Sequence, residues 1–347
     1  MLRRTPILFA ALLCSAAAHA QTCQTFQTSS DTPPALTGRV VYQEDDSGRL
    51  YMYDFAARHF IDIPQLGWGL TAARNSVFSP DGKSILFTAV MGKGGNAKRQ
   101  VFYWRIGAAN YVNLTDGKTV PNEDPKFSPR GDAIVWKQNF GIGTADLVID
   151  PDDPSMAHIE NFRKLINGSP SGLDGSPSTP NEASAPVFSP SGRYIYYYVN
   201  AHAYARVMRY DTVTRVSASP FAFTPVDGIH YYYPLDPDLY TFLYVSWPDA
   251  STMHDKVYVY SILNQTAYLW NGTDCDAENA DPSPVDENDI IFSRKAAGDR
   301  YRLYLGQLAD PGHPLSATPA AGKIWNLPTG INGTKGDMIG ANYTNAR

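Results

Sequence analysis

The amino-acid sequence predicts an all-β protein, a six-bladed β-propeller of four-stranded antiparallel blades, and two observations predict it. The first is a motif in which Phe-Ser-Pro, one variable residue and Gly precede a short apolar strand. It occurs at Val77–Phe87, Lys126–Trp136 and Val187–Tyr197. The second is the period, since prolines of the series stand at 80, 129, 190, 237 and 284. Units of about 40–50 residues with several short strands are typical of propeller blades.

The motif itself is a turn followed by a strand. Proline presets one backbone angle of the turn, and glycine accepts the positive φ that closes it. Weaker copies occur at 236–244 and 283–292, and one period before Pro80 the strand Arg39–Tyr42 follows Pro33 and Pro34. The six units are therefore placed near the following prolines: Pro34, Pro80, Pro129, Pro190, Pro237 and Pro284.

A second strand follows the motif strand in five of the units. These segments are short, aromatic and β-branched, and turn residues bound them, as is typical of strands. They are Arg49–Asp54, Gln100–Trp104, Arg206–Asp211, Lys256–Tyr260 and Tyr301–Leu305.

Together, the Phe-Ser-Pro-Asp-Gly phrase and its following strands resemble the PD40 repeat of TolB-type propellers, a WD40-like repeat without the Gly-His and Trp-Asp dipeptides. The resemblance covers about residues 34 to 330. It implies the propeller fold. It does not choose a function, because this family serves in periplasmic protein docking, in peptidase-associated gating and in several carbohydrate-active enzymes.

The first twenty residues have the pattern of a signal peptide. Arg3 and Arg4 precede the apolar run Ile7–Ala17, and Ala18-His19-Ala20 forms a small-x-small cleavage site. We expect cleavage after Ala20 and a periplasmic or secreted protein in which residues 21–347 form a single domain. No later segment has the apolar length of a membrane span.

Charge and motif searches exclude several classes of function. The formal net charge of −5 is mildly acidic and argues against nucleic acid or an anionic membrane surface as a partner. The histidines show no close metal-ligand spacing, and no Gly-x-Ser-x-Gly nucleophile motif occurs. We therefore expect no cofactor and no resident metal, and a monomeric protein.

Two cysteines remain after removal of the signal peptide. In an oxidising compartment, Cys23 and Cys275 are expected to form one disulfide that ties the N-terminal segment to the sixth unit. Two free thiols are the alternative. The first unit also lacks an innermost strand before its motif, and either Gly336–Tyr343 or Gln21–Phe26 is expected to supply it and close the ring.

The long step between Pro129 and Pro190 holds a loop insertion at 150–186. Within it, Met156–Leu165 is expected to form a short helix, and Gly168–Pro186 a loop rich in Ser, Pro and Gly. The aspartates of Asp150–Asp153 allow a solvated turn or a Ca²⁺ site, although two prolines interrupt the pattern of a calcium loop.

Candidate ligand-binding residues lie just before the motif strands, where pseudo-symmetry places them around one mouth of the channel. The same polar residues also serve to satisfy backbone groups, so a purely structural role is the alternative. The candidates are Arg74, Asn75, Asn122, Glu123, Asn181, Glu182, Glu278 and Asn279.

Three functions remain open from the sequence. The first is a binding or scaffold module that docks a protein or peptide, with a basic group of the partner entering the acidic ring. The second is a polysaccharide lyase acting on a uronate-containing glycan, with His230 or Tyr232 as base and Arg74 offsetting the carboxylate. The third is a glycosidase that uses two carboxylates from Glu123, Glu182 and Glu278.

Overall fold

The structure is a computed structural model. It describes residues 28–65, 67–91, 97–116, 119–168, 182–201, 204–219, 229–234, 241–246, 256–261, 266–269, 277–282, 289–295, 300–307, 323–327, 331 and 336–344. The predicted signal peptide, both cysteines of the predicted disulfide and Asn181 lie outside these residues.

The described strands form six four-stranded antiparallel sheets, numbered I to VI here in chain order. Sheet I contains β24 (Met338–Thr344), β1 (Arg39–Glu44), β2 (Arg49–Asp54) and β3 (His59–Ile61). Sheet II contains β4 (Leu70–Phe78), β5 (Ser84–Met91), β6 (Arg99–Arg105) and β7 (Val112–Asn113). Sheet III contains β8 (Asn122–Phe127), β9 (Ala133–Gln138), β10 (Gly141–Val148) and β11 (His158–Ile166).

The second half of the chain repeats this arrangement. Sheet IV contains β12 (Glu182–Phe188), β13 (Tyr194–Ala201), β14 (Tyr204–Asp211) and β15 (Ser217–Ala218). Sheet V contains β16 (Ile229–Pro234), β17 (Thr241–Ser246), β18 (Lys256–Ser261) and β19 (Thr266–Leu269). Sheet VI contains β20 (Ala277–Pro282), β21 (Asp289–Lys295), β22 (Tyr301–Gln307) and β23 (Ile324–Asn326).

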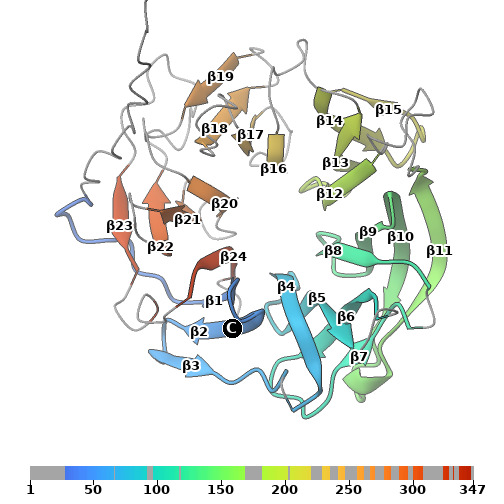
Figure 1. Cartoon of the computed structure of the whole chain (residues 1–347), viewed down its shortest axis with the longest axis horizontal. Coiled ribbons are helices and arrows are strands. Elements are labelled where there is room, and N and C mark those ends of the chain that lie inside the picture. Colours follow the sequence, from blue (N-terminus) through green and yellow to red (C-terminus); the bar gives the residue numbers. More distant parts are fainter. Residues whose placement is uncertain are drawn as a thin grey trace, which may run out of the picture.

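The sheets surround a central opening, and the strand named first for each sheet above lies nearest to it (Figure 1). The fold is therefore a β-propeller of four-stranded antiparallel blades, as the repeat predicts. Sheet I takes its innermost strand from the other end of the chain, because β24 pairs antiparallel with β1. Of the two segments expected to close the ring, the C-terminal one is confirmed as the partner of β1.

The repeated motif closes the hairpin between the two inner strands of sheets II, III and IV. In sheet II, the N–H of Ser79 donates to the carbonyl of Ser84 at 2.9 Å, and the N–H of Ser84 donates back to the Ser79 hydroxyl at 3.0 Å. Ser128 and Ser189 make the same pair of bonds. Gly82 has φ 66°, which explains the glycine of the motif.

The motif also sets how neighbouring sheets meet. A Cβ atom placed on Gly131 would lie 3.5 Å from Cδ of Pro80, and one on Gly192 would lie 3.7 Å from Cδ of Pro129. The proline ring of one turn therefore rests on the glycine of the next turn along the chain. The same contact occurs between the turns of sheets II and III and between the turns of sheets III and IV. The motif therefore sets the spacing of these three sheets at their motif turns.

The core lies between the sheets rather than inside one of them. Alternate residues of each strand face opposite neighbours; Trp136 packs in the core shared with sheet II, and Val135 packs in the core shared with sheet IV. Further cores lie between sheets I and II and between sheets I and VI. Sheets I, II and III are therefore held by apolar burial on both faces, which is the main favourable term in folding.

The insertion differs from its prediction. The expected helix over Met156–Leu165 is wrong: the chain makes a 3₁₀ turn at Pro154–Met156 and then the strand β11, which pairs with β10 across two register shifts. Spacing of Ile159, Phe162 and Ile166 resembles a helical face, but pairing with an existing sheet edge outweighs such a local preference. Among the described residues, no helix is long and apolar enough to cross a membrane.

Candidate functional site

The innermost strands share a bulge at the central opening. The register of each with its neighbour is interrupted, for example between Glu123 and Lys126 in β8 and between Ser184 and Val187 in β12. Residues with a positive φ lie at the bulges of four strands: Ala72 and Asn75 in β4, Asp124 in β8, Ala185 in β12 and Gly340 in β24. Asn, Asp and Gly accept this conformation most easily. The predicted site residues that the structure describes thus lie within the inner strands and not in loops that precede them.

Bulge residues connect one sheet to the next. The N–H of Asn75 donates to Oε1 of Gln43 in sheet I at 2.9 Å, and its side-chain amide donates to the Asp124 carboxylate in sheet III. That carboxylate also accepts the backbone N–H of Ala185 in sheet IV. Burial raises the pKa of Asp124, and the neighbouring Glu123 carboxylate raises it further. Asn75 and Asp124 therefore hold the inner ring together, which is the structural role weighed against ligand binding for Asn75.

A network of four charged side chains crosses sheets II, III and IV beside these bulges. Glu123 pairs with Arg99 of β6 and, at 3.3 Å, with Nζ of Lys137 directly across the β8–β9 hairpin. Lys137 also pairs with Glu182, the first residue of β12. The structure thus brings together two of the predicted acids, and a single ammonium group lies between them.

The network favours the charged forms of Glu123 and Lys137. Burial acts to raise the pKa of Glu123, but the hydrogen bond from Arg99 and the charge of Lys137 outweigh it, so that the pKa lies below its usual value. Burial likewise acts to lower the pKa of Lys137, but Glu182 and Glu123 outweigh it and raise the pKa. A carboxylate held ionised in this way is a poor general acid, because a glycosidase acid needs a raised pKa.

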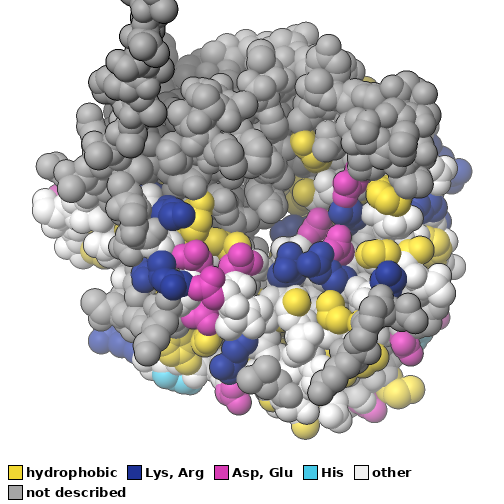
Figure 2. All heavy atoms as spheres, viewed as in Figure 1, with side chains coloured by type: hydrophobic (Ala, Val, Ile, Leu, Met, Phe, Trp, Pro, Cys, Tyr) yellow, Lys and Arg dark blue, Asp and Glu magenta, His cyan; other side chains and the backbone are white. Residues whose placement is uncertain are grey.

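Arg74 has the position in β4 that Glu123 has in β8, one residue before the bulge. It is partly buried, and within the described part of the chain its side chain makes no hydrogen bond or ion pair. Figure 2 shows Lys and Arg side chains next to Asp and Glu side chains at the central opening, over β4 and β8. Since the two acids of the network already have cationic partners, Arg74 adds a positive charge that the described residues do not compensate.

Asn122 has a different environment from the one expected of a ligand-binding residue. Its side chain is fully buried. The amide oxygen accepts a hydrogen bond from Nε1 of Trp136 at 2.9 Å, and the amide nitrogen donates to Gln100 and to the carbonyl of Val120. Asn122 therefore anchors the core of sheet III and does not reach the surface of the opening.

The remaining candidates lie in the inner strands of sheets V and VI, whose backbone the structure describes. His230 lies at the register shift of β16, between Ile229 and Tyr231. Tyr232 lies two residues later in the same strand, where it pairs with Tyr244. Glu278 and Asn279 lie at the shift of β20, so that Asn279 has the place in its strand that Asn75 and Asp124 have in theirs. The backbone of these residues thus lies in the inner strands of sheets V and VI, at or next to the register shifts.

Sequence reasoning missed Arg99, Lys137, Asp124 and Gln43. Counting back across the Pro-Arg-Gly turn would place Lys137 opposite Asp124, and only the register shift between Glu123 and Lys126 places it opposite Glu123, so the sequence did not indicate this pair. Asp124 directly follows Glu123 in β8, whereas Arg99 and Gln43 come from sheets II and I, and no spacing in the sequence indicates these two. In the described residues, no group of three or more His, Cys, Asp or Glu side chains is arranged to hold a metal ion. Asp150 and Asp153 instead accept local backbone N–H groups.

No protein-family model and no curated protein matches the chain. Solved structures do. TolB from Acinetobacter baumannii is 15% identical, with a TM-score of 0.61 over 90% of this chain and 67% of that chain. A chain of a nidogen/laminin complex is 8% identical, with a TM-score of 0.53 over 89% of this chain and 99% of that one. The GH74 enzyme of Niastella koreensis is 14% identical, with a TM-score of 0.53 over 86% and 47%.

These relatives include an enzyme and a member of a protein complex, and at such low identity their similarity establishes the fold alone. The chain is a β-propeller that resembles TolB propeller domains and several propellers of other function.

Proposed function

We propose that the six sheets are the six blades of one closed ring, and that the protein is a binding module that docks a protein or peptide at the central opening. The observation that carries this proposal is Arg74, a guanidinium with no partner among the described residues beside a charge-balanced network. Arginine offers five N–H donors in a planar fork that matches a carboxylate. We also propose that the protein is exported by its N-terminal signal and acts as a monomer.

Balanced charges beside Arg74 determine which group of a partner fits. The sequence suggested that a basic group enters an acidic ring, but on this side Glu123 and Glu182 are already paired with Arg99 and Lys137. An Asp or Glu side chain or a C-terminal carboxylate of the partner suits Arg74 better, because it forms a charge-assisted hydrogen bond without breaking an existing pair. The similarity to a chain of the nidogen/laminin complex agrees with a role in protein assembly.

Enzymatic alternatives have weaker support. The lyase hypothesis needs His230 or Tyr232 and Arg74 on one sugar unit, but β16 and β4 lie on opposite sides of the opening (Figure 1).

The glycosidase hypothesis needs a carboxylic acid with a raised pKa, and the pKa of Glu123 is lowered. Glu182 shares an ammonium partner with Glu123. Neither the lowered pKa of Glu123 nor the ammonium partner of Glu182 suits a general acid.

The test is a pull-down from an extract of the source organism with three forms of the protein: wild type, Arg74→Glu and Lys83→Glu. Lys83 is an exposed cation at the turn of the same sheet, so it controls for net charge. We expect a protein that wild type and Lys83→Glu retain and that Arg74→Glu loses. Equal capture by all three forms, or no capture by any of them, contradicts docking at Arg74.

A second measurement separates binding from catalysis. The mature protein is mixed with a panel of uronate-containing polysaccharides, and the ultraviolet absorbance of unsaturated product is followed. We expect no rise. A rise that disappears in His230→Ala would replace the binding module by a lyase.

A further inference from the structure

A second candidate site lies away from the central opening, between sheets III and IV. The facing surfaces of these sheets leave an open cleft of about 930 Å³. Such a volume is at the upper end of the ~300–1,000 Å³ that is typical of ligand sites. The cleft runs from the motif turns of both sheets to the outer strand β11 of sheet III and to β14 and the turn after it in sheet IV.

The walls of the cleft are basic although the chain as a whole is acidic. Five basic side chains line it, against the two acidic side chains of Asp132 and Asp146. The basic residues are Arg130, Arg163, Lys164, Arg193 and Arg215. A concentration of one sign of charge in a concave surface raises the local concentration of ligands of the opposite sign.

Some of these basic side chains have close anionic partners, and others do not. Arg130 pairs with Asp132 at 2.8 Å and Arg193 with Asp211 at 2.8 Å. Arg163 lies 3.7 Å from Asp146, whose other oxygen already accepts a hydrogen bond from Asn161. Within the described residues, the side chain of Arg215 has no hydrogen bond or ion pair.

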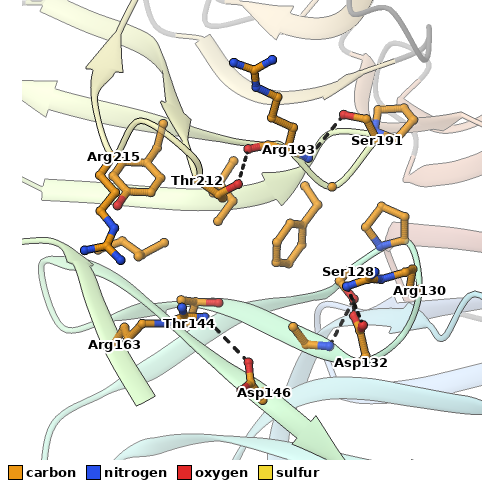
Figure 3. A pocket seen from close by; sticks show the side chains of 18 of the residues that line it. Ser128, Arg130, Asp132, Thr144, Asp146, Arg163, Ser191, Arg193, Thr212 and Arg215 are labelled. Atoms are coloured by element: carbon orange, nitrogen blue, oxygen red, sulfur yellow. Dashed lines mark hydrogen bonds and ion pairs between the residues drawn. The ribbon is translucent and has the colours of Figure 1, made fainter. Parts of the chain in front are cut away.

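Figure 3 shows how these side chains lie. Arg215 extends from sheet IV into the gap, Arg163 and Arg130 lie on the sheet III side, and the Arg193 side chain runs out of the gap. The cleft therefore presents one guanidinium from sheet IV and two from sheet III. Hydroxyl groups of Thr144 and Ser191 lie on the two walls.

The interior of the cleft is apolar. Leu165, Phe188 and Tyr210 line it, and all three are only partly buried against the core that sheets III and IV share. That core has five fully buried members among the described side chains, whereas the cores on either side of sheet II have twelve and eleven. Apolar surface that the fold leaves open between basic walls suits a ligand with both acidic and apolar groups.

We infer that this cleft is a docking site for an acidic peptide segment of a partner protein, with an aromatic or aliphatic side chain as its anchor. Asp and Glu side chains of the segment pair with Arg163 and Arg215 from the two walls. The anchor covers Phe188 and Leu165. A glycan suits the cleft less well, because it would leave these apolar side chains in contact with polar groups.

The test is selection of a random twelve-residue peptide library displayed on phage against the folded wild-type protein. Selected clones are then assayed against Arg163→Glu/Arg215→Glu and against Arg74→Glu. Both cleft arginines have exposed side chains, so the double variant should keep the fold, and circular dichroism checks this. The Arg74 variant separates this site from the central opening.

We expect clones that combine Asp or Glu with an aromatic or aliphatic residue. Their binding should fall at least tenfold in the double variant, weaken with added salt and remain unchanged in Arg74→Glu. Arg215→Lys should restore part of the binding, since lysine keeps the charge but not the fork. A selection without clones, clones without acidic residues, or binding that the double variant retains overturns the proposal. So does binding of oligogalacturonate with the same arginine dependence, which would assign the cleft to an anionic glycan.

Discussion

Two neighbouring interfaces of the ring are built from the same repeat and close differently. Between sheets II and III, Trp136, Tyr103 and other buried side chains fill the space. Between sheets III and IV, the buried residues Val135 and Ile142 have smaller side chains than Trp136 and Tyr103, and the cleft of about 930 Å³ remains. The Pro-on-Gly contact of the motif turns is the same at both interfaces. The repeat therefore sets the spacing of the sheets, and side-chain volume decides whether the space between them is filled.

Trp136→Ala, at the filled interface between sheets II and III, should lose the most stability. The side chain is fully buried, and its loss also leaves Oδ1 of Asn122 without its indole donor. We expect a loss of about 3–5 kcal/mol in the free energy of unfolding, measured by urea denaturation with circular dichroism. Ile195→Ala, beside the cleft, should lose only about 2 kcal/mol, because water and neighbouring side chains reach that space. A greater loss at Ile195 would contradict the difference between the interfaces.

Replacing an alanine by leucine at each of the two interfaces tests the same difference in packing. Ala145 is fully buried in the core between sheets II and III, so Ala145→Leu should overpack it and cost about 1–3 kcal/mol of stability. Ala133 lines the open cleft, and Ala133→Leu should change stability by less than about 0.5 kcal/mol. The urea midpoints of both variants measure this. Equal destabilisation would mean that the cleft is packed in solution.

The smallest effect concerns the charge network that joins sheets II, III and IV. Because the pKa of Glu123 in the folded protein lies below its usual value of 4.5, its stabilising contribution is present above pH 4.5 and is lost as the pH falls through the lowered value. The urea midpoint of wild type should therefore fall more steeply below pH 4.5 than that of Glu123→Gln. Glu160→Gln, on the exposed strand β11, should keep the wild-type slope below pH 4.5. Parallel profiles of wild type and Glu123→Gln would show that the network does not stabilise the fold.

Much of the fold could be predicted from the sequence because three sheets contain a clear copy of the motif and two more contain a weaker copy. Proline, glycine and serine act locally in the turn, so the three clear copies locate the inner hairpins of sheets II, III and IV. The five predicted second strands are confirmed as β2, β6, β14, β18 and β22. Strand β11 was missed, because its structure depends on pairing with β10 and not on its own pattern.

Less of the candidate site could be predicted. Glu123 and Glu182 were expected on one ring, and they do share Lys137. Their neutralisation was not expected, because the bulge after Glu123 shifts the register that decides which side chains face each other. Asn122 shows the same limit: a buried amide and a ligand-binding amide look alike in a sequence, and the indole that it accepts from is fourteen residues away.

The pairing of β24 with β1 has a consequence for the time course of folding. Gly38, next to β1, and Tyr343 of β24 are bonded across 305 positions of the chain. A ribosome makes β1 long before β24, so the inner edge of sheet I stays unpaired until β24 has been made. An unpaired strand edge is a template for association with other chains. Long-range closure is also slow. Aggregation of newly made protein should therefore depend on how soon β24 reaches that edge.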